Sequence, residues 1–150
     1  MDHHERKPTI LVVEDDTALR RLVVSMLNRG GYATLAAGRA ADGLSIARQH
    51  HGALDLAILD IVMPKISGLD LATDLGREYP ELKILYISGY VDSIAADVLS
   101  RRSPDHLLLK PFTERALLER VRLLLQLAPK FQPVQETGPA DPKLRGGTLR

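Results

Sequence analysis

The chain has 150 residues, of which 45% are hydrophobic, and a formal net charge of +1. This length fits one domain with its own core, and the absence of cysteine excludes disulfides, thiol catalysis and cysteine-ligated zinc. The small net charge argues against a domain-wide basic surface for nucleic acid, and no apolar run approaches the roughly 20 residues of a membrane-spanning helix.

The first predicted unit is a buried strand followed by a helix. Residues 9–13 are short, apolar and rich in β-branched side chains, as buried strands are. Thr17 is a candidate N-cap of the helix, and Gly30 and Gly31 predict its end. The apolar residues between them recur at helical spacing and predict the inward face: Leu19, Leu22, Val23, Met26 and Leu27.

Two further units follow with the same alternation. Residues 32–36 predict a second strand, and Gly38 turns the chain into a helix. Within that helix Gly43 is unfavourable by roughly 1 kcal/mol relative to alanine. Residues 54–59 predict a third strand, and Ser67 predicts the start of the next helix. The apolar faces expected on these two helices consist of Ala40, Leu44 and Ala47, and of Leu69, Ala72 and Leu75.

The last two units complete the series. Residues 82–87 predict a fourth strand, residues 106–109 predict a fifth, and Thr113 is the expected N-cap of a final helix. The helix between these strands is expected to carry an apolar stripe of Val91, Ile94, Ala95 and Val98. The inward face of the final helix is expected to consist of Leu117, Val121, Leu124 and Leu125.

Five strand–helix units in strict alternation predict an α/β fold, with a parallel sheet and helices on both of its faces. We expect residues 8–128 to form this one domain. Residues 1–7 are expected to be a flexible leader. Residues 129–150 are expected to be a flexible tail, because a segment rich in proline and glycine cannot bury enough apolar surface to offset the entropy of ordering.

Polar residues stand where four of the predicted strands end. Ligands of open α/β sheets bind outside the carboxyl ends of the strands, and in a parallel sheet these ends lie along one edge. The residues expected there are Glu14, Asp15 and Asp16 after the first strand, Asp60 after the third, Ser88 and Gly89 after the fourth, and Lys110 and Pro111 after the fifth.

This combination of carboxylates, a hydroxyl and an ammonium group suits phosphoryl chemistry. Neighbouring carboxylates repel one another unless a cation lies among them, and their hard oxygens suit Mg²⁺. A lysine ammonium can pair with a phosphoryl oxygen, and a carboxylate can act as a nucleophile and form an acyl phosphate. The pattern therefore predicts a site that accepts a phosphoryl group, with Mg²⁺ as the cofactor.

Each of these residues also has an ordinary structural interpretation. Asp60 can form a turn, Asp15 or Asp16 can cap the first helix, Lys110 can be a solvated charge, and residues 88–89 can be a loop. The joint pattern favours the chemical site, because four separate strand ends would otherwise supply matching groups by coincidence. Asp16 is the exception, and a helix cap remains its expected role.

Four segments resemble the receiver domain of two-component response regulators. They are residues 10–16 (ILVVEDD), 60–68 (DIVMPKISG), 87–89 (ISG) and 110–112 (KPF), and their order and spacing match the family over about residues 8–127. The resemblance implies a flavodoxin-like (βα)5 fold of three layers, with the strands in the order 2-1-3-4-5.

The resemblance also implies a role for each residue of the site. Asp60 would accept the phosphoryl group from a phosphohistidine of a sensor histidine kinase or phosphotransfer protein. Glu14, Asp15 and the carboxylate of Asp60 would hold Mg²⁺, together with the backbone carbonyl of Val62. Lys110 would pair with a phosphoryl oxygen.

The switching residues are implied in the same way. Ser88 would turn to hydrogen-bond the phosphoryl group and draw the following loop with it, Gly89 would leave room for the phosphate, and the peptide between Lys110 and Pro111 would be cis. The family usually has an aromatic residue three positions before the lysine. Leu107 stands there instead, and its ordinary interpretation is a core leucine.

The expected function is a phosphorylation-controlled switch that relays phosphoryl groups or binds a downstream protein. Because the segment after Pro129 is too short for an output domain, we expect a stand-alone response regulator. A receiver segment of a hybrid histidine kinase or of a multidomain regulator is the alternative. We expect a cytoplasmic protein that binds neither nucleic acid directly nor a membrane.

An enzyme is the remote alternative. A Mg²⁺-dependent phosphohydrolase with an aspartate nucleophile usually has a second acid two residues after it, and here that residue is the apolar Val62. Neither Val62 nor Tyr90 offers an evident group to orient water, so we expect a long-lived phosphoryl group on Asp60.

Overall fold

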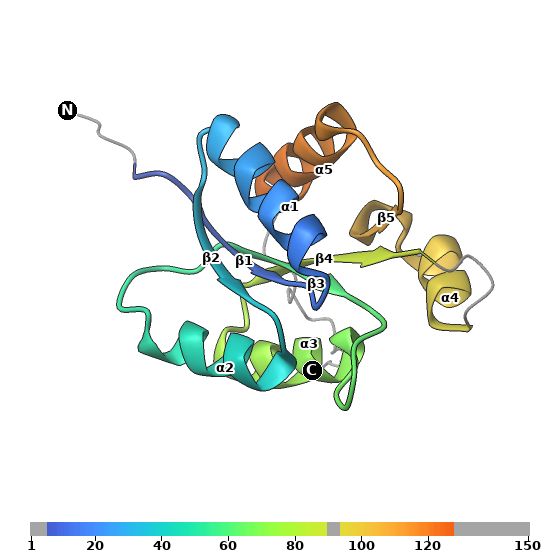
Figure 1. Cartoon of the computed structure of the whole chain (residues 1–150), viewed down its shortest axis with the longest axis horizontal. Coiled ribbons are helices and arrows are strands. Elements are labelled where there is room, and N and C mark those ends of the chain that lie inside the picture. The colour runs from blue at the N-terminus through green and yellow to red at the C-terminus, as the bar shows by residue number, and fades with distance from the viewer. Residues whose placement is uncertain (1–5, 90–93, 128–150) are drawn as a thin grey trace, which may run out of the picture.

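The computed structural model describes residues 6–89 and 94–127 (Figure 1). The predicted tail, residues 129–150, lies outside the described residues, as do residues 1–5 of the predicted leader. Among the described residues, no helix has the length and hydropathy needed to cross a bilayer. The elements follow in the order β1 (Thr9–Val13), α1 (Thr17–Arg29), β2 (Ala33–Ala37), α2 (Ala40–Gln49), β3 (Leu56–Asp60), α3 (Gly68–Glu78), β4 (Lys83–Ser88), α4 (Ile94–Arg102), the 3-10 helix η1 (Pro104–His106), β5 (Leu107–Leu109) and α5 (Glu114–Gln126).

The strands form one parallel sheet in the order β2-β1-β3-β4-β5, which confirms the predicted fold class and strand order. The central strands β1 and β3 are direct neighbours. Their register pairs Val13 with Leu59. The residues that come next along the two strands, Glu14 and Asp60, are therefore brought to the same part of the carboxyl edge.

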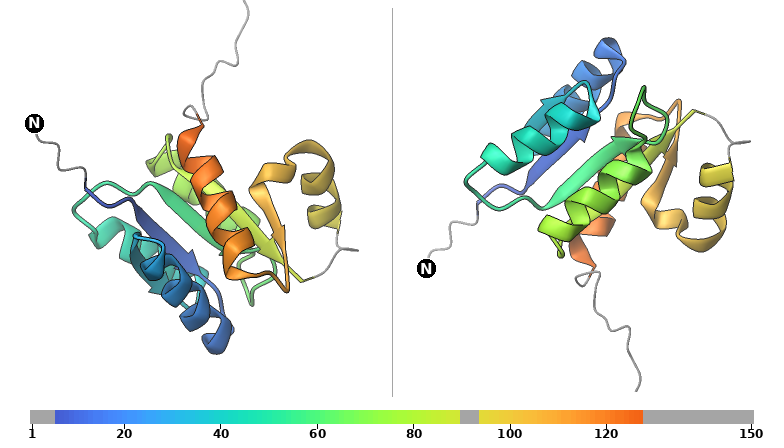
Figure 2. Two further views of the ribbon diagram at one scale, coloured as in Figure 1. Left: turned by 90° about the horizontal axis from the view of Figure 1, so that it is seen from above. Right: turned by 90° about the horizontal axis from the view of Figure 1, so that it is seen from below.

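Helices cover both faces of the sheet, with α1 and α5 on one face and α2 and α3 on the other, while α4 lies beside β5 (Figures 1 and 2). Side chains alternate between the two faces along each strand. In β1, Ile10 and Val12 join the core under α1 and α5, whereas Leu11 and Val13 join the core under α2 and α3. Burial on both faces explains why the strands are continuous apolar runs in the sequence.

Gly43 lies inside α2, where glycine is unfavourable for helix formation. A Cβ atom at this position would lie 2.7 Å from Cγ2 of Val13. The glycine therefore allows α2 to approach β1 closely, and this packing offsets the unfavourable helix propensity.

Of the two predicted helix caps, Thr113 is confirmed, and Ser67, which was expected to mark the start of α3, is its N-cap. The side chains of Ser67 and Thr113 accept hydrogen bonds from the backbone N–H groups of α3 and α5. The prediction for Thr17 is wrong, because Thr17 is the first residue of α1 and the side chain of Asp16 accepts the N–H of Leu19. The helix begins one residue earlier than expected, and Asp16 has the role that the sequence favoured for it.

Several strand bounds differ from the predicted ones by one or two residues. Two of the differences concern the site, because Asp60 and Ser88 are the last residues of β3 and β4 instead of following them. Asp60 pairs with Ile87 of β4, and Ser88 pairs with Leu109 of β5. The backbone hydrogen bonds of the sheet thus hold both residues. His106 belongs to η1 and not to β5.

The predicted apolar stripe of α4 is confirmed only for Ala95, which is partly buried and packs against the cluster of Ile61, Ala96 and Leu107. Ile94 is 83% exposed and Val98 is 44% exposed, whereas Ala96 is buried against the sheet; Val91 lies outside the described residues. Leu22, predicted to face inward from α1, is 47% exposed. The most buried residue of α4 is thus the small Ala96, with Ala95 and Leu99 packed against the same cluster, and the expected stripe did not include Ala96 or Leu99.

Candidate functional site

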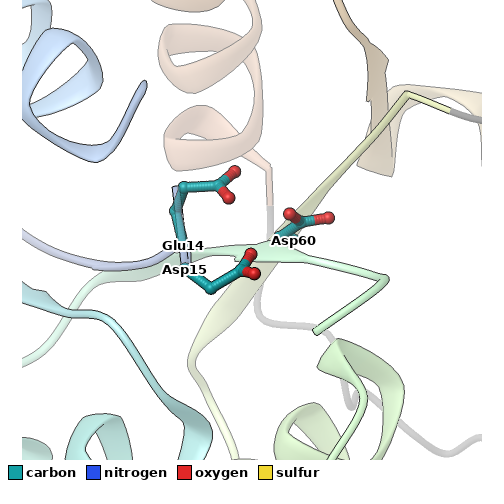
Figure 3. Close-up of side chains that lie close together, drawn as sticks. All are labelled: Glu14, Asp15 and Asp60. Atoms are coloured by element: carbon teal, nitrogen blue, oxygen red, sulfur yellow. The ribbon is translucent and has the colours of Figure 1, made fainter. Parts of the chain in front are cut away.

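The carboxyl ends of β1 and β3 bring three acidic side chains together (Figure 3). Glu14 and Asp15 follow β1, and Asp60 is the last residue of β3. Each residue offers one carboxylate oxygen, and these oxygens all lie within 4.8 Å of one another. The acidic cluster expected from the sequence is therefore present in the fold.

Asp60 is only 4% exposed, and both of its carboxylate oxygens have a donor. The backbone N–H of Val62 donates to Oδ1 over 3.1 Å, and Nζ of Lys110 donates to Oδ2 over 3.0 Å. These contacts fix the direction of the carboxylate toward the edge of the sheet. The predicted role of the Val62 carbonyl as a metal ligand stays a prediction.

Lys110 reaches the acids from the end of β5. Its backbone N–H donates to the carbonyl of Ser88 over 2.8 Å, and the peptide between Lys110 and Pro111 is cis, as predicted. Its Nζ lies 3.1 Å from Oε1 of Glu14 as well as 3.0 Å from Oδ2 of Asp60. Burial acts to lower the pKa of Lys110, but the hydrogen bond to Asp60 and the negative charges of the two acids outweigh it and raise that pKa, which keeps the ammonium charged.

Glu14 is fully buried and has an incomplete set of partners. Its Oε2 accepts the backbone N–H of Asp16 over 3.0 Å. Its Oε1 is close to Lys110 but outside hydrogen-bond orientation, and among the described residues it is the one buried side-chain oxygen or nitrogen without a hydrogen bond. Burial, assisted by nearby Asp60, raises the pKa of Glu14 to about 7, although the Asp16 N–H and Lys110 act in the opposite direction. A cation at this carboxylate would replace the missing partner.

Ser88 and Gly89 lie next to the acids on the neighbouring strand. Ser88 is buried and follows Ile87, which pairs with Asp60. A Cβ atom at Gly89 would lie 3.6 Å from Cδ of Lys110, which is an ordinary van der Waals distance. The structure thus brings both residues to the expected edge, and their roles toward a phosphoryl group stay predictions.

Leu107, at the position where the family usually has an aromatic residue, is 6% exposed. It packs with Ile61 and Ala96 in a small cluster that also contacts Tyr86, its partner in β4. Leu107 is therefore a core residue, as its ordinary interpretation suggested.

Two close contacts at the site were not predicted from the sequence. Nη1 of Arg20 donates to the backbone carbonyl of Glu14 over 2.7 Å. A Cβ atom at Gly68 would overlap the carbonyl oxygen of Asp60, so α3 begins directly against the peptide of this residue. Both contacts involve main-chain atoms at the ends of strands, and no residue pattern in the sequence predicts either of them.

The loop between Asp60 and α3 contains a strained residue. Lys65 has a φ of 71°, and the N–H of Ile66 donates to the carbonyl of Pro64 over 2.8 Å. This is a three-residue turn with a positive φ at a residue other than glycine, which is an uncommon and unfavourable conformation.

Comparisons of the sequence agree on one family. The family model described as "Response regulator receiver domain" matches residues 10–122. The chain is 31% identical over 118 residues to a protein named sensor kinase CckA from Brucella abortus, covering 79% of this chain and 12% of that protein. Transcriptional regulators among its relatives are matched over about half of their length.

Solved structures agree with the sequence comparisons. A CheY-like response regulator receiver domain from Methanospirillum hungatei is 30% identical with a TM-score of 0.69, covering 80% of this chain and 94% of that one. The response regulator TrrA from Thermotoga maritima, crystallised in complex with Mg²⁺ and BeF, is 32% identical with a TM-score of 0.66, covering 78% of this chain and 98% of that one.

Proposed function

The chain belongs to the family of response regulator receiver domains, and from that premise we propose that it is a phosphoacceptor in a two-component phosphorelay, with Asp60 as the acceptor. The observation that carries the proposal is the carboxylate of Asp60 at the sheet edge, within reach of two further acids and of Lys110. The donor would be a phosphohistidine of a sensor histidine kinase or phosphotransfer protein.

Transfer requires positioning and charge neutralisation more than it requires acid–base groups. A carboxylate oxygen of Asp60 would attack phosphorus, the phosphorus–nitrogen bond would break with its electron pair left on the imidazole, and an acyl phosphate would form. Lys110 lies 3.0 Å from Oδ2 of Asp60, so its ammonium is placed to pair with a phosphoryl oxygen. The N–H of Val62 fixes the other carboxylate oxygen during the attack.

We propose Mg²⁺ as the cofactor of this site. Glu14, Asp15 and Asp60 would hold it, with the Val62 carbonyl as a further ligand. The buried Oε1 of Glu14, which lacks a hydrogen bond, fits a hard divalent cation. When bound, the ion would neutralise charge on the carboxylates and on the phosphoryl oxygens. The Mg²⁺ and BeF in the structure of TrrA support this assignment by analogy.

Mass spectrometry after incubation with acetyl phosphate and Mg²⁺ tests the proposal. We expect one added phosphoryl group on the wild type and none on Asp60→Ala. Asp70→Ala removes an exposed carboxylate from the first turn of α3 and serves as the matched control, which should be modified like the wild type. An unmodified wild type, or an Asp60→Ala variant modified to the same extent, would refute the assignment.

We further propose that Ser88 couples phosphorylation to α4 and β5. Ser88 pairs with Leu109 of β5, so a shift of its side chain acts next to the face formed by α4, β5 and α5. Ser88→Ala should leave Asp60 phosphorylatable but weaken the change in hydrogen exchange of this face. An equal change in wild type and variant would contradict the coupling. We propose that a downstream protein binds this face, without direct binding of nucleic acid.

We propose an acceptor in preference to a phosphohydrolase. Val62 is apolar and 49% exposed, so it supplies no acid or base beside Asp60. A phosphoryl group on Asp60 should therefore persist, and a half-life of only seconds would contradict this. Relatives matched over 12% and about half of their length show that receivers of this family occur within longer proteins, so a stand-alone regulator and a receiver within a longer chain both fit the proposal.

A further inference from the structure

Arg20 lies behind the acidic site, on the first turn of α1. Its Nη1 donates to the backbone carbonyl of Glu14 over 2.7 Å, and its Nη2 donates to Oγ1 of Thr17 over 3.4 Å. The guanidinium therefore contacts the main chain of Glu14 and not its carboxylate. It fixes where the peptide between Glu14 and Asp15 lies and leaves both acidic side chains available.

The guanidinium of Arg20 lies close to Gly38, in the loop that follows β2. A Cβ atom at Gly38 would lie 2.8 Å from Nη1 of Arg20 and 3.4 Å from its Cζ. Any side chain at position 38 would displace the guanidinium from this place. The glycine and the arginine thus form one contact between two loops at the carboxyl edge of the sheet.

Other hydrogen bonds hold the rest of the loop between β1 and α1. The N–H of Glu14 donates to the carbonyl of Ala37 over 3.1 Å, and the N–H of Asp16 donates to Oε2 of Glu14 over 3.0 Å. Asp15 lies between these two residues with an exposed side chain. The two peptides that flank Asp15 set the direction of its Cα–Cβ bond, and Arg20 donates to the carbonyl of the first of them.

We propose that Arg20 is a positioning residue for the metal site, which holds the Glu14–Asp15 peptide so that both carboxylates face Asp60. This inference rests on the proposed function, because it takes Mg²⁺ as the ligand of the three acids. A ligand set whose geometry is held in advance binds a cation more tightly than one that must be ordered on binding.

Electrostatics alone predicts the opposite effect. Arg20 carries a positive charge near the acids, so removing it should strengthen the binding of a cation through reduced repulsion. Positioning predicts that removal weakens binding. The sign of the change in Mg²⁺ affinity therefore separates the two effects.

Isothermal titration of Mg²⁺ into the intact chain provides the measurement. We expect Arg20→Met to raise the dissociation constant about tenfold, the effect of losing one charge-assisted hydrogen bond that favours the bound geometry. Arg21→Met is the matched control, because it removes the same charge from the next residue, which is exposed. Its dissociation constant should be unchanged or slightly lower.

Gly38→Ala tests the same contact without any change of charge. The added methyl group would displace the flexible end of Arg20, and we expect Mg²⁺ binding weaker by about three- to tenfold. Arg20→Lys keeps the charge but has one donor nitrogen in place of the two that contact Glu14 and Thr17, so its Mg²⁺ affinity should lie between those of wild type and Arg20→Met. Circular dichroism in EDTA at the titration temperature verifies that each variant is folded.

The outcomes separate this inference from the proposed function. Failure of the wild type to bind Mg²⁺ would refute the metal site itself. Binding by the wild type with equal affinity in folded Arg20→Met and Arg21→Met, or no effect of Gly38→Ala, would refute only the role of Arg20.

Discussion

Both ends of the sheet carry acids and a lysine, but the hydrogen bonding of these groups is complete at the amino end and incomplete at the carboxyl end. At the amino end, both carboxylate oxygens of Asp55 accept hydrogen bonds of 2.8 Å from Arg6, and Oδ2 also accepts the N–H of Thr9 over 2.8 Å. The Arg6 hydrogen bond is the main cause that holds the pKa of Asp55 below its ordinary value. Lys83, only 7% exposed, donates to the carbonyls of Leu124 and Leu127 at the end of α5.

At the carboxyl end the bonding is incomplete. A single ammonium group, on Lys110, lies between Glu14 and Asp60, and the pKa of Glu14 is raised to about 7. The comparison teaches that an acid and a lysine stabilise this fold where the chain itself completes their bonding. Where the hydrogen bonding of these groups is incomplete, the fold is less stable, and a ligand can supply the missing partner.

Glu14→Gln should give the largest change at the carboxyl end. The pKa of Glu14 is raised from 4.5 to about 7, so the folded state binds its proton more tightly than the unfolded state does. The stability from this proton is complete below about pH 4.5 and is lost as the pH rises to about 7. At about 1.4 kcal/mol per pKa unit, the wild type should lose about 3 kcal/mol of unfolding free energy as the pH rises through this window, and Glu14→Gln, which has no such proton, should not.

Urea denaturation in EDTA at several pH values measures this difference. The comparison of variant with wild type removes every contribution that the two proteins share. Parallel stability curves for the two proteins would contradict the raised pKa. Mg²⁺ should stabilise the wild type at neutral pH and Glu14→Gln less, because the ion would lose a charged ligand.

Lys83→Met should lower the free energy of unfolding by about 2 to 3 kcal/mol, because two charged hydrogen bonds are lost and the carbonyls of Leu124 and Leu127 at the end of α5 lose their donor, the first of them in a buried contact. Lys7→Met removes the same charge from an exposed lysine and should change the free energy of unfolding by less than about 0.5 kcal/mol. Equal losses in the two variants by urea denaturation would show that charge, and not bonding, accounts for the effect.

Lys65→Gly should give the smallest change in the free energy of unfolding, and it should raise this free energy where Lys83→Met lowers it. Glycine adopts the positive φ without strain, which should stabilise the fold by about 1 to 2 kcal/mol. Glycine also increases the conformational entropy of the unfolded chain, which should destabilise the fold by up to about 1 kcal/mol. We expect a gain of up to about 1 kcal/mol in the free energy of unfolding. Lys7→Gly is the control at a position where no positive φ is found. A loss of stability in Lys65→Gly would show that the turn is unstrained.

Much of the fold was predictable because strands buried on both faces leave continuous apolar runs in the sequence. The acids and Lys110 were predictable because the carboxyl ends of parallel strands meet at one edge. Most of the inward face of α4 was not, since its most buried residue is the small Ala96, which a spacing of large apolar residues does not indicate. The contact of Arg20 was not either, because it joins a side chain to a main-chain carbonyl across a loop whose path only the tertiary structure determines.

The pairing of Tyr86 with Leu107 across β4 and β5 has an optical consequence. Tyr86 packs against the cluster under α4, and burial raises its pKa above the ordinary 10.0 of tyrosine. The chain contains four tyrosines and no tryptophan, so its near-ultraviolet absorbance and emission come mainly from phenol rings. A displacement of α4 would change the surroundings of one of these chromophores. The protein thus carries a native spectroscopic reporter on β4, directly beside the strand that holds Leu107.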